Sequence, residues 1–402
     1  MASRSGLSRD ELAERAGVAP DLVDRLVRLG ILTRSEGDAS FRLADVYRIR
    51  LALACERAGL PIEGIGQAIA AGKLSLSYMD LPNYRWAALT PISYRELADE
   101  LELPFDLVLD VVQAMGYARP HEGDRVREDD WDVFRLVRLA LTVLDRDATL
   151  RSARVYADAL RRIAEAEASL YDTYVVGRLL NQGMSYREAV DLANDFGAQI
   201  SPMQEQFIIT TYRRMQERRW TEYTIEGIEE ILEEMGLYQR PERSPAFGFV
   251  DLAGYTRMTE EWGDQASARL VADLSEMVDT VARSHHGEPV KWLGDGVMVY
   301  FRNPANAVSG TVEMVRRAPE VGLPAHAGIA SGPVVFQDGD YFGRTVNMAA
   351  RIASHATEGQ TLVSREVAEL AATNAIRFRE VGRVELKGFS DPVLVYEALS
   401  PE

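Results

Sequence analysis

The chain of 402 residues has one cysteine, Cys55, and no apolar run that approaches the roughly 18 to 20 residues needed to span a bilayer. A single cysteine excludes an intrachain disulfide framework and a cysteine-rich zinc module, and it fits a reducing compartment. The first residues, MASRSGLSRDEL, lack the apolar core of a signal peptide. We therefore expect a soluble cytoplasmic protein without a transmembrane segment, in which Cys55 is buried in a helix and chemically silent.

Positive charge is also scarce, with 45 Lys and Arg against 62 Asp and Glu and a formal net charge of −17. This balance opposes nonspecific binding to nucleic acid or to an anionic membrane, and it is compatible with a cation site. The five histidines show no zinc-ligand spacing, and His285 with His286 is predicted to end a helix near a turn. The 47% of apolar residues is enough to form a core in each of two or three domains.

The two halves of the chain follow different patterns. Residues 1 to about 240 are rich in Leu, Ala, Arg and Glu at helical spacing and predict an all-α half, whereas residues 246–402 alternate short β-like runs with amphipathic helices. The two prolines of QRPERSP predict a linker at 241–245. The second half is expected to be an α+β domain with a mainly antiparallel sheet. Its predicted elements are a strand over 246–251, a helix over about 264–285, a hairpin over 289–301 and a helix over 306–318.

An internal repeat lies in the first half. SRDELAERAGVAPDLVDRLVRLGILTRSEGD, from Ser8, matches SYRELADELELPFDLVLDVVQAMGYARPHEGD, from Ser93. In each copy the serine is a candidate N-cap, and a second helix ends before Gly30 or Gly116. This spacing is typical of a helix-turn-helix. The first copy, continued by FRLADVYRIRLALACERAGLPIEGI, resembles the N-terminal fold of the MerR family of transcription regulators. The resemblance predicts a module over 1–75, followed by a helical domain over 76–240 that contains the second copy.

The charge of this half argues against DNA as its main partner. The first 73 residues carry 11 Lys and Arg against 10 Asp and Glu, which leaves little charge for neutralising phosphates. MerR-like proteins place an arginine and two aromatic residues where this sequence has Asp24, Arg25 and Leu26. We therefore prefer a module used for packing and signalling. DNA binding, with phosphate contacts from Arg25, Arg28 and Arg42, is the alternative.

Two aspartates in strand-turn contexts give the sharpest chemical signal. Asp251 lies in GFVDLAGYT, at the end of an apolar strand, and Gly254 permits a tight turn after it. Asp295 lies in VKWLGDGVMVYF, at the tip of a predicted hairpin between Gly294 and Gly296. Either aspartate alone could be an ordinary turn residue. Together, on adjacent strands, the two carboxylates would form a hard-oxygen site suited to Mg²⁺ or Mn²⁺ bridged to phosphates.

The stretch from 247 to 398, with these two motifs followed by DGDYFG, TVNMAAR and ELKGFSDPV, resembles the catalytic domain of the class III nucleotidyl cyclases. The resemblance implies a ferredoxin-like α+β fold and two divalent cations, Mg²⁺ or Mn²⁺, in each site. It also implies a role for each matching residue. These are Asp251 and Asp295 as metal ligands, aided by the carbonyl of Leu252; Lys291 and Asp340 as base readers; Asn347 and Arg351 as the transition-state pair; and Lys387 on the terminal phosphates.

The chemistry of these residue types agrees with those roles. A lysine that donates to N1 and an aspartate that accepts from the N6 amino group recognise adenine, whereas guanine presents the reverse pattern. Lys291 with Asp340 therefore favours ATP over GTP. Asn347 and Arg351 are one helical turn apart, so both side chains can face the ribose and the α-phosphate. Cyclisation requires positioning and charge stabilisation rather than covalent help from the protein.

The resemblance also predicts a two-fold homodimer. Lys291 and Asp295 lie more than about 10 Å apart on a strand that rises about 3.3 Å per residue, and in the resembling family they serve different sites. Each site would take Asp251 and Asp295 from one chain and the other five side chains from its partner. Apolar stripes on the helices predicted over 150–240 would add a dimer core.

The sequence thus predicts a cytoplasmic adenylyl cyclase that converts ATP to 3′,5′-cyclic AMP and pyrophosphate and is regulated by its helical half. Two alternatives are a DNA-binding transcription regulator whose cyclase-like domain senses nucleotides, and a cyclase-like dimerisation module without activity. Trp292 and Arg344 stand where many relatives carry smaller polar residues, and we interpret both as local variation.

Overall fold

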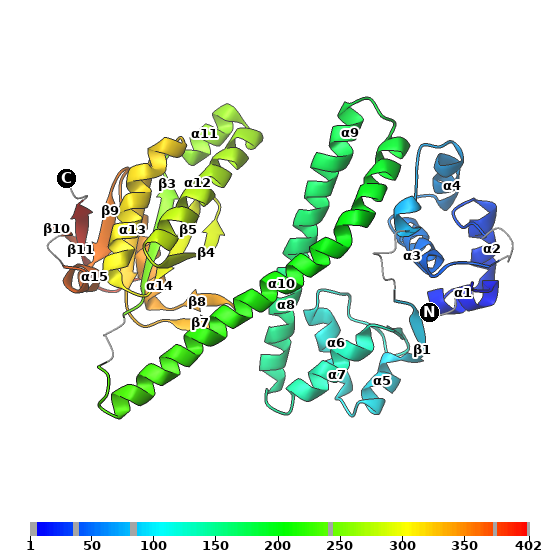
Figure 1. Cartoon of the computed structure of the whole chain (residues 1–402), viewed down its shortest axis with the longest axis horizontal. Coiled ribbons are helices and arrows are strands. Elements are labelled where there is room, and N and C mark those ends of the chain that lie inside the picture. The colour runs from blue at the N-terminus through cyan, green and yellow to red at the C-terminus, as the bar shows by residue number, and fades with distance from the viewer. Residues whose placement is uncertain (1–5, 35–39, 81–86, 240–243, 373–375, 400–402) are drawn as a thin grey trace. The chain divides into compact units, whose positions relative to one another are not determined.

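The computed structural model of the chain describes residues 6–34, 40–80, 87–239, 244–372 and 376–399 (Figure 1). The chain divides into two compact units, Met1–Glu226 and Gly227–Glu402, called here the N-terminal unit and the C-terminal unit. The predicted linker at 241–245 falls largely outside the described residues. Within the described ranges, no helix has the length and apolar character needed to cross a membrane.

The N-terminal unit is built mainly from helices. Its helices are α1 (Arg9–Ala16), α2 (Pro20–Arg28), α3 (Leu43–Arg57), α4 (Ile62–Ala70), η1 (Ser77–Asp80), α5 (Tyr94–Glu100), α6 (Phe105–Ala114), α7 (Asp130–Ala140), α8 (Arg146–Leu170), the π-helical η2 (Tyr171–Val176), α9 (Gly177–Asn181) and α10 (Tyr186–Glu234). The last of these, α10, runs on into the C-terminal unit.

A small sheet corrects the expectation that this half is all-α. The strands β1 (Leu89–Ser93) and β2 (Arg125–Arg127) pair antiparallel, and Thr90 Oγ1 donates to Val126 O at 2.9 Å. The segment LTPIS contains two β-branched residues, which favour a strand, and a proline, which disfavours a helix. Its partner lies more than 30 residues away, beyond the reach of a local pattern.

The helix starts and stops predicted from the repeat are present. Ser8 caps α1 and Ser93 caps α5, each in a capping box with the glutamate three residues later. Gly30 and Gly116, with φ of 69° and 87°, follow α2 and α6. Ser185 and Glu188 form the same reciprocal hydrogen bonds at the start of α10. Both helix pairs therefore exist, while their assignment to the MerR fold stays a prediction.

Each helix pair lies in an apolar core of its own. Leu12, Leu26 and Ile49 belong to the first core, whereas Leu107 and Phe134 belong to the second. Cys55, in the last turn of α3, is half-buried rather than buried as expected. The buried face of α3 is formed by residues earlier in the helix, and its last turn is only partly covered.

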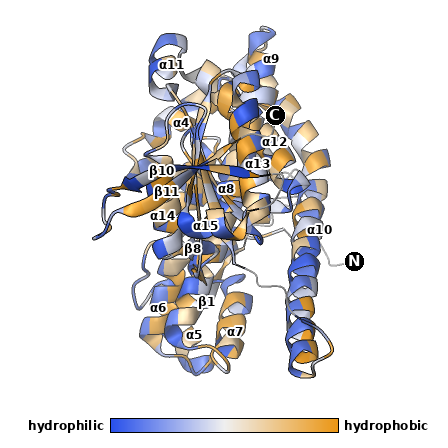
Figure 2. Ribbon diagram, turned by 90° about the vertical axis from the view of Figure 1, so that its left-hand side faces the viewer, coloured by the Kyte–Doolittle hydropathy of each residue, from blue (hydrophilic) through white to orange (hydrophobic). Residues whose placement is uncertain are grey.

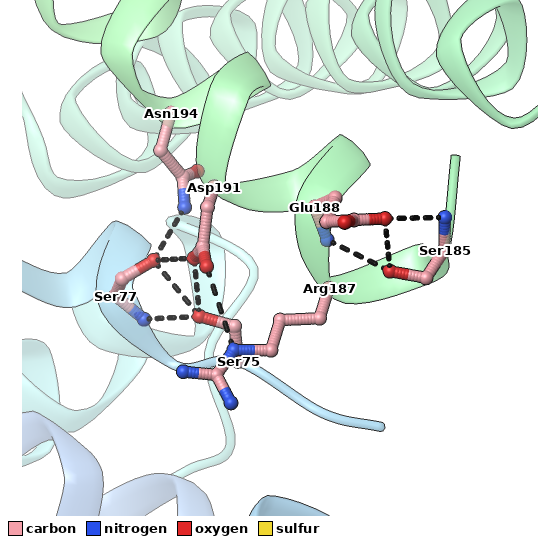
Figure 3. Close-up of polar contacts among 7 residues, drawn as sticks. All are labelled: Ser75, Ser77, Ser185, Arg187, Glu188, Asp191 and Asn194. Carbon is pink, nitrogen blue, oxygen red and sulfur yellow. Dashed lines mark hydrogen bonds and ion pairs between the residues drawn. The ribbon is translucent and has the colours of Figure 1, made fainter. Parts of the chain in front are cut away.

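A polar cluster ties the segment after α4 to the start of α10 (Figure 3). The hydroxyls of Ser75 and Ser77 each lie 2.6 Å from Asp191 Oδ1 and donate to it. Asn194 Nδ2 in turn donates to Ser77 Oγ at 2.9 Å. These hydroxyl donors hold the pKa of the Asp191 carboxyl below its ordinary value. We call these four residues the Asp191 cluster.

The long helices α8 and α10 carry apolar side chains that nothing in the described chain covers. Tyr156, Leu160, Phe207, Met215 and Trp220 are all more than half exposed. Figure 2 shows apolar and polar residues interspersed along α10. The apolar stripes predicted for this region are therefore at the surface of a single chain, as a dimer core would require.

The C-terminal unit is an α+β domain. Its elements are β3 (Ala246–Leu252), α11 (Tyr255–Trp262), α12 (Asp264–Ser284), β4 (Gly287–Leu293), β5 (Gly296–Phe301), α13 (Pro304–Arg317), η3 (Ala318–Val321), β6 (Ala325–Ser331), β7 (Val335–Gln337), β8 (Asp340–Phe342), α14 (Arg344–Ala353), β9 (Thr361–Ser364), α15 (Arg365–Leu370), β10 (Arg377–Val384) and β11 (Val393–Leu399). The predicted strand, hairpin and two helices are all present within a few residues of their expected bounds.

Seven of the described strands form one sheet in the order β10-β11-β9-β6-β3-β5-β4. All neighbours are antiparallel except β6 and β9, which confirms the mainly antiparallel sheet. One face of the sheet packs against α12 and α13, through residues such as Val250 and Val299. The other face packs against α14, through residues such as Phe247 and Met298. Because side chains alternate along a strand, odd-numbered residues of β3, including Asp251, share the face of α14.

Candidate functional site

The two predicted metal ligands lie next to each other at one edge of the domain. Asp251 is near the end of β3, and Asp295 is in the turn between β4 and β5. The register of β3 and β5 pairs Asp251 with Gly296, the residue after Asp295. A Cβ at position 296 would lie 2.7 Å from Asp251 Oδ1, so any larger residue there would displace the Asp251 carboxylate.

The electrostatics of this edge favour a cation. Burial, and secondly the charge of Asp295, raise the pKa of the Asp251 carboxyl above its ordinary value. The Asp251 side chain is nevertheless 47% exposed, so a ligand can reach it. On the neighbouring strand β6, His326 Nε2 lies 3.9 Å from Asp251 Oδ2. A divalent cation between the two carboxylates would offset their mutual repulsion.

The donor set also fits a hard cation that is shared with a substrate. No cluster of three or more His, Cys, Asp or Glu side chains suited to a metal occurs among the described residues. The protein would therefore supply two carboxylates and the carbonyl of Leu252, whose side chain is in the core. Mg²⁺ is bound in this manner, with few protein ligands and with water and phosphate oxygens completing its shell.

The start of α11 follows Asp251 closely in the chain and has no side-chain cap. Gly254, with φ of 80°, turns the chain from β3 into α11. No side chain caps this helix, and its first turn has no acidic residue. Its first backbone N–H groups are therefore not used by a side-chain cap, and the positive end of the helix dipole favours an anion.

Lys291 and Asp340 are brought together from strands 49 residues apart, and the lysine ammonium donates to Asp340 Oδ2. The other carboxylate oxygen accepts from the Tyr341 N–H at 2.8 Å. Tyr341 stacks on Tyr300 of β5 with ring centroids 5.2 Å apart. This stacking fixes the small β7–β8 hairpin over the sheet, and it thereby places Asp340 beside Lys291.

The neighbouring Trp292 has its side chain on the opposite face of the sheet. It packs against the core formed with α12 and α13. Trp292 therefore packs against the core on the face opposite Lys291, and its interpretation as local variation stays a prediction.

Asn347 and Arg351 lie on the exposed side of α14, as the spacing predicts. Val346, Ala349 and Ile352 cover the sheet from the other side of the same helix. Lys387 is exposed in the turn that follows β10. Within the described part of the chain, neither Arg351 nor Lys387 is paired with a carboxylate. Both cations are therefore available to an anionic ligand.

The predicted residues thus form local groups within one chain. Asp251 lies with Asp295, Lys291 with Asp340, and Asn347 with Arg351. No hydrogen bond or ion pair among the described residues joins the two metal ligands to the other five side chains. Sequence reasoning missed His326, because its place beside Asp251 depends on the pairing of β3 with β6. The available signal was the segment AHAGIA, in which small apolar residues on either side of His326 are compatible with a strand that projects the histidine from one face.

Comparison with known proteins relates the chain to nucleotide cyclases. Residues 238–398 match the family model described as the adenylate and guanylate cyclase catalytic domain. An uncharacterized protein of Mycobacterium tuberculosis is 26% identical over 353 residues, covering 84% of this chain and 87% of the relative. A pH-sensitive adenylate cyclase of the same species is 27% identical over 295 residues, 70% of each chain. An adenylate cyclase of Streptomyces coelicolor is 33% identical over 130 residues, 32% of this chain and 34% of that one.

Solved structures are similar to part of the chain. The adenylyl cyclase CyaB from P. aeruginosa is 26% identical and has a TM-score of 0.37, with 40% of this chain and 95% of that chain covered. The guanylyl cyclase Cya2 is 22% identical, with a TM-score of 0.36 and coverages of 41% and 96%.

Proposed function

Because residues 238–398 match the model of the adenylate and guanylate cyclase catalytic domain, we propose that the protein is an adenylyl cyclase that converts ATP to 3′,5′-cyclic AMP and pyrophosphate. The observation that carries the choice of ATP is the ion pair between Lys291 and Asp340. Side by side, an ammonium donor and a carboxylate acceptor complement the N1 and N6 edge of adenine. The names of several relatives, which are adenylate cyclases, support this choice.

Asp251, Asp295 and the carbonyl of Leu252 are the proposed ligands of two divalent cations, Mg²⁺ or Mn²⁺. When bound, such cations increase the acidity of the ribose 3′-hydroxyl and stabilise charge on the leaving pyrophosphate. The first turn of α11, beside Asp251, is proposed to hold phosphate oxygens with its backbone N–H groups.

The remaining residues are proposed to position the nucleotide. The planar guanidinium of Arg351 can donate two hydrogen bonds to α-phosphate oxygens, where negative charge grows as the 3′-oxygen attacks. Asn347, one turn earlier on the same exposed side of α14, would orient the ribose. Lys387 would contact the terminal phosphates. Arg351 and Lys387 suit these roles because neither is neutralised by a carboxylate in the described chain.

We further propose that two copies of the chain share each site. One copy would supply Asp251 and Asp295, and the other would supply Lys291, Asp340 and the three phosphate and ribose contacts. The exposed apolar residues of α8 and α10 support a second contact between the copies. The N-terminal unit would regulate the sites, since α10 ends at Glu234, shortly before β3 begins at Ala246.

Incubation of the full-length protein with ATP or GTP, and with Mn²⁺ or Mg²⁺, tests the proposal. Cyclic AMP should form from ATP faster than cyclic GMP forms from GTP. Asp295→Ala should lower the rate by about 10²-fold or more, as expected for loss of a preorganised charge contact. The matched control is Asp391→Ala, an exposed aspartate in another turn of the same unit, which should leave the rate unchanged. No turnover of either nucleotide by the folded protein would overturn the proposal.

A further inference from the structure

The turn that carries Lys387 is fastened to the start of α14 by Arg344 and Phe389. The guanidinium carbon of Arg344, the first residue of α14, lies over the Phe389 ring, 5.0 Å from its centroid. This distance is within the range of a cation–π interaction. Phe389 lies two residues after Lys387 in the chain. The contact therefore joins α14, which carries Asn347 and Arg351, to the segment that carries Lys387.

The turn itself fixes the backbone position of Lys387. The Phe389 N–H donates to Leu386 O at 3.0 Å, which closes a four-residue turn with Lys387 second. Gly388, the third residue, has a φ of 91°, a conformation that glycine adopts without strain. Leu386 is 5% exposed and packs in the same core as Val346 of α14. One end of the turn is thus held by burial of Leu386, and the other end is held by Phe389.

Arg344 lies on the functional side of its helix. Positions 344, 347 and 351 are spaced by three and four residues, so their side chains share one side of α14. All three residues are exposed, whereas Thr345 and Val346 between them are buried. A single helical side therefore carries Asn347, Arg351 and the residue that contacts the Lys387 turn.

We propose that Arg344 is a positioning residue that acts through Phe389 to hold Lys387 where it meets the terminal phosphates of the nucleotide. The proposal rests on the function proposed above. It assigns a use to an exposed arginine that none of the roles proposed above includes. Loss of the contact would leave Leu386 as the main anchor of the turn, and Lys387 would sample positions from which it cannot reach the phosphates.

The kinetic test is a cycle between Arg344→Gln and Lys387→Ala. In the wild-type background, Arg344→Gln should raise the KM for ATP and the inhibition constant for pyrophosphate by about two- to fivefold, the factor expected of an exposed cation–π contact. In the Lys387→Ala background it should have no further effect. Arg365→Gln is the matched control, because Arg365 is also the first residue of a helix of this unit and pairs with Glu369.

Amide hydrogen exchange provides a readout that does not depend on activity. Arg344→Gln and Phe389→Leu should each accelerate exchange of the peptide that contains Phe389, and the double variant should be no faster than either. Phe389→Tyr, which keeps the ring, should retain the wild-type exchange rate.

Two results would overturn the proposal. One is an effect of Arg344→Gln that persists in the Lys387→Ala background, which would mean that Arg344 binds the nucleotide directly. The other is unchanged exchange in both Arg344→Gln and Phe389→Leu. If the wild-type protein forms no cyclic nucleotide, the proposed function fails, and the exchange experiment still decides whether the contact holds the turn.

Discussion

At the scale of single residues, the candidate site combines one ion pair, Lys291 with Asp340, with charges that have no partner of opposite charge within hydrogen-bonding distance in the described chain. Asp251 is partly buried beside another carboxylate, which raises its pKa. Arg351 and Lys387 have no carboxylate partner among the described residues. A half-buried carboxylate beside a like charge costs stability in the free protein, and such groups are common where a charged ligand binds. A nucleotide with its cations would satisfy charges of both signs.

Asp130 allows a residue-scale test of stability against pH. Its Oδ2 accepts from the Tyr94 hydroxyl at 2.8 Å and from the Arg127 N–H at 3.1 Å, and burial raises its pKa. Because the folded pKa exceeds the unfolded one, the carboxylate destabilises the fold once it ionises. The cost is absent below the unfolded pKa of about 4 and complete above the folded pKa. Asp130→Asn, whose amide oxygen can accept both bonds, should therefore gain stability relative to wild type as pH rises from about 4 to 7.

Urea denaturation of both proteins across this pH range measures the effect. Asp129→Asn is a control whose stability should change with pH in the opposite direction, because the Arg127 guanidinium lowers the pKa of the neighbouring Asp129. Its ionised carboxylate stabilises the fold, so the variant should lose stability relative to wild type as pH rises. A difference between Asp130→Asn and wild type that does not vary with pH would contradict this account of Asp130.

At the scale of elements, caps and turns that depend on a few neighbouring residues could be predicted from the sequence, whereas contacts between distant segments could not be read from local patterns. The helices that begin after Ser8 and Ser93 follow from a capping box four residues long, which the sequence displays directly. β1 was missed because its partner β2 lies in a distant segment. The positions of Asp251 and Asp295 at strand ends were readable from turn glycines. The contact between Lys291 and Asp340, by contrast, depends on the stacking of Tyr341 on Tyr300, which no spacing reveals.

The Asp191 cluster gives an element-scale prediction. Asp191→Ala removes the acceptor of both serine hydroxyls that hold the segment after α4 to α10. We expect the unfolding free energy of the N-terminal unit to fall by about 1 kcal/mol, a modest value for hydrogen bonds to a partly exposed charge. Thermal denaturation followed by circular dichroism measures this loss. Asp195→Ala, one turn later on the same helix and exposed, should change the stability little. Equal effects of the two substitutions would show that the cluster contributes nothing.

At the scale of the whole molecule, the excess of acidic residues and the ion pairs of the first module argue against DNA as the main partner. Arg25, one of the candidate phosphate contacts, has its guanidinium 2.5 Å from Glu63 and 3.6 Å from Glu56. A phosphate would have to displace these carboxylates, which lowers the gain from binding. We therefore propose a helical regulatory unit followed by a cyclase domain whose site is completed by a second chain.

A mixing experiment tests this shared site most directly. Asp295→Ala lacks a metal ligand, and Arg351→Ala lacks a phosphate contact, so each protein alone should be nearly inactive. After subunit exchange of an equal mixture, half of the dimers would contain one chain of each kind, and each such dimer would have one intact site. The account predicts cyclic AMP formation at about a quarter of the wild-type rate. Activity of the mixture no greater than the mean of the two variants would contradict a cyclase whose sites are shared between two chains.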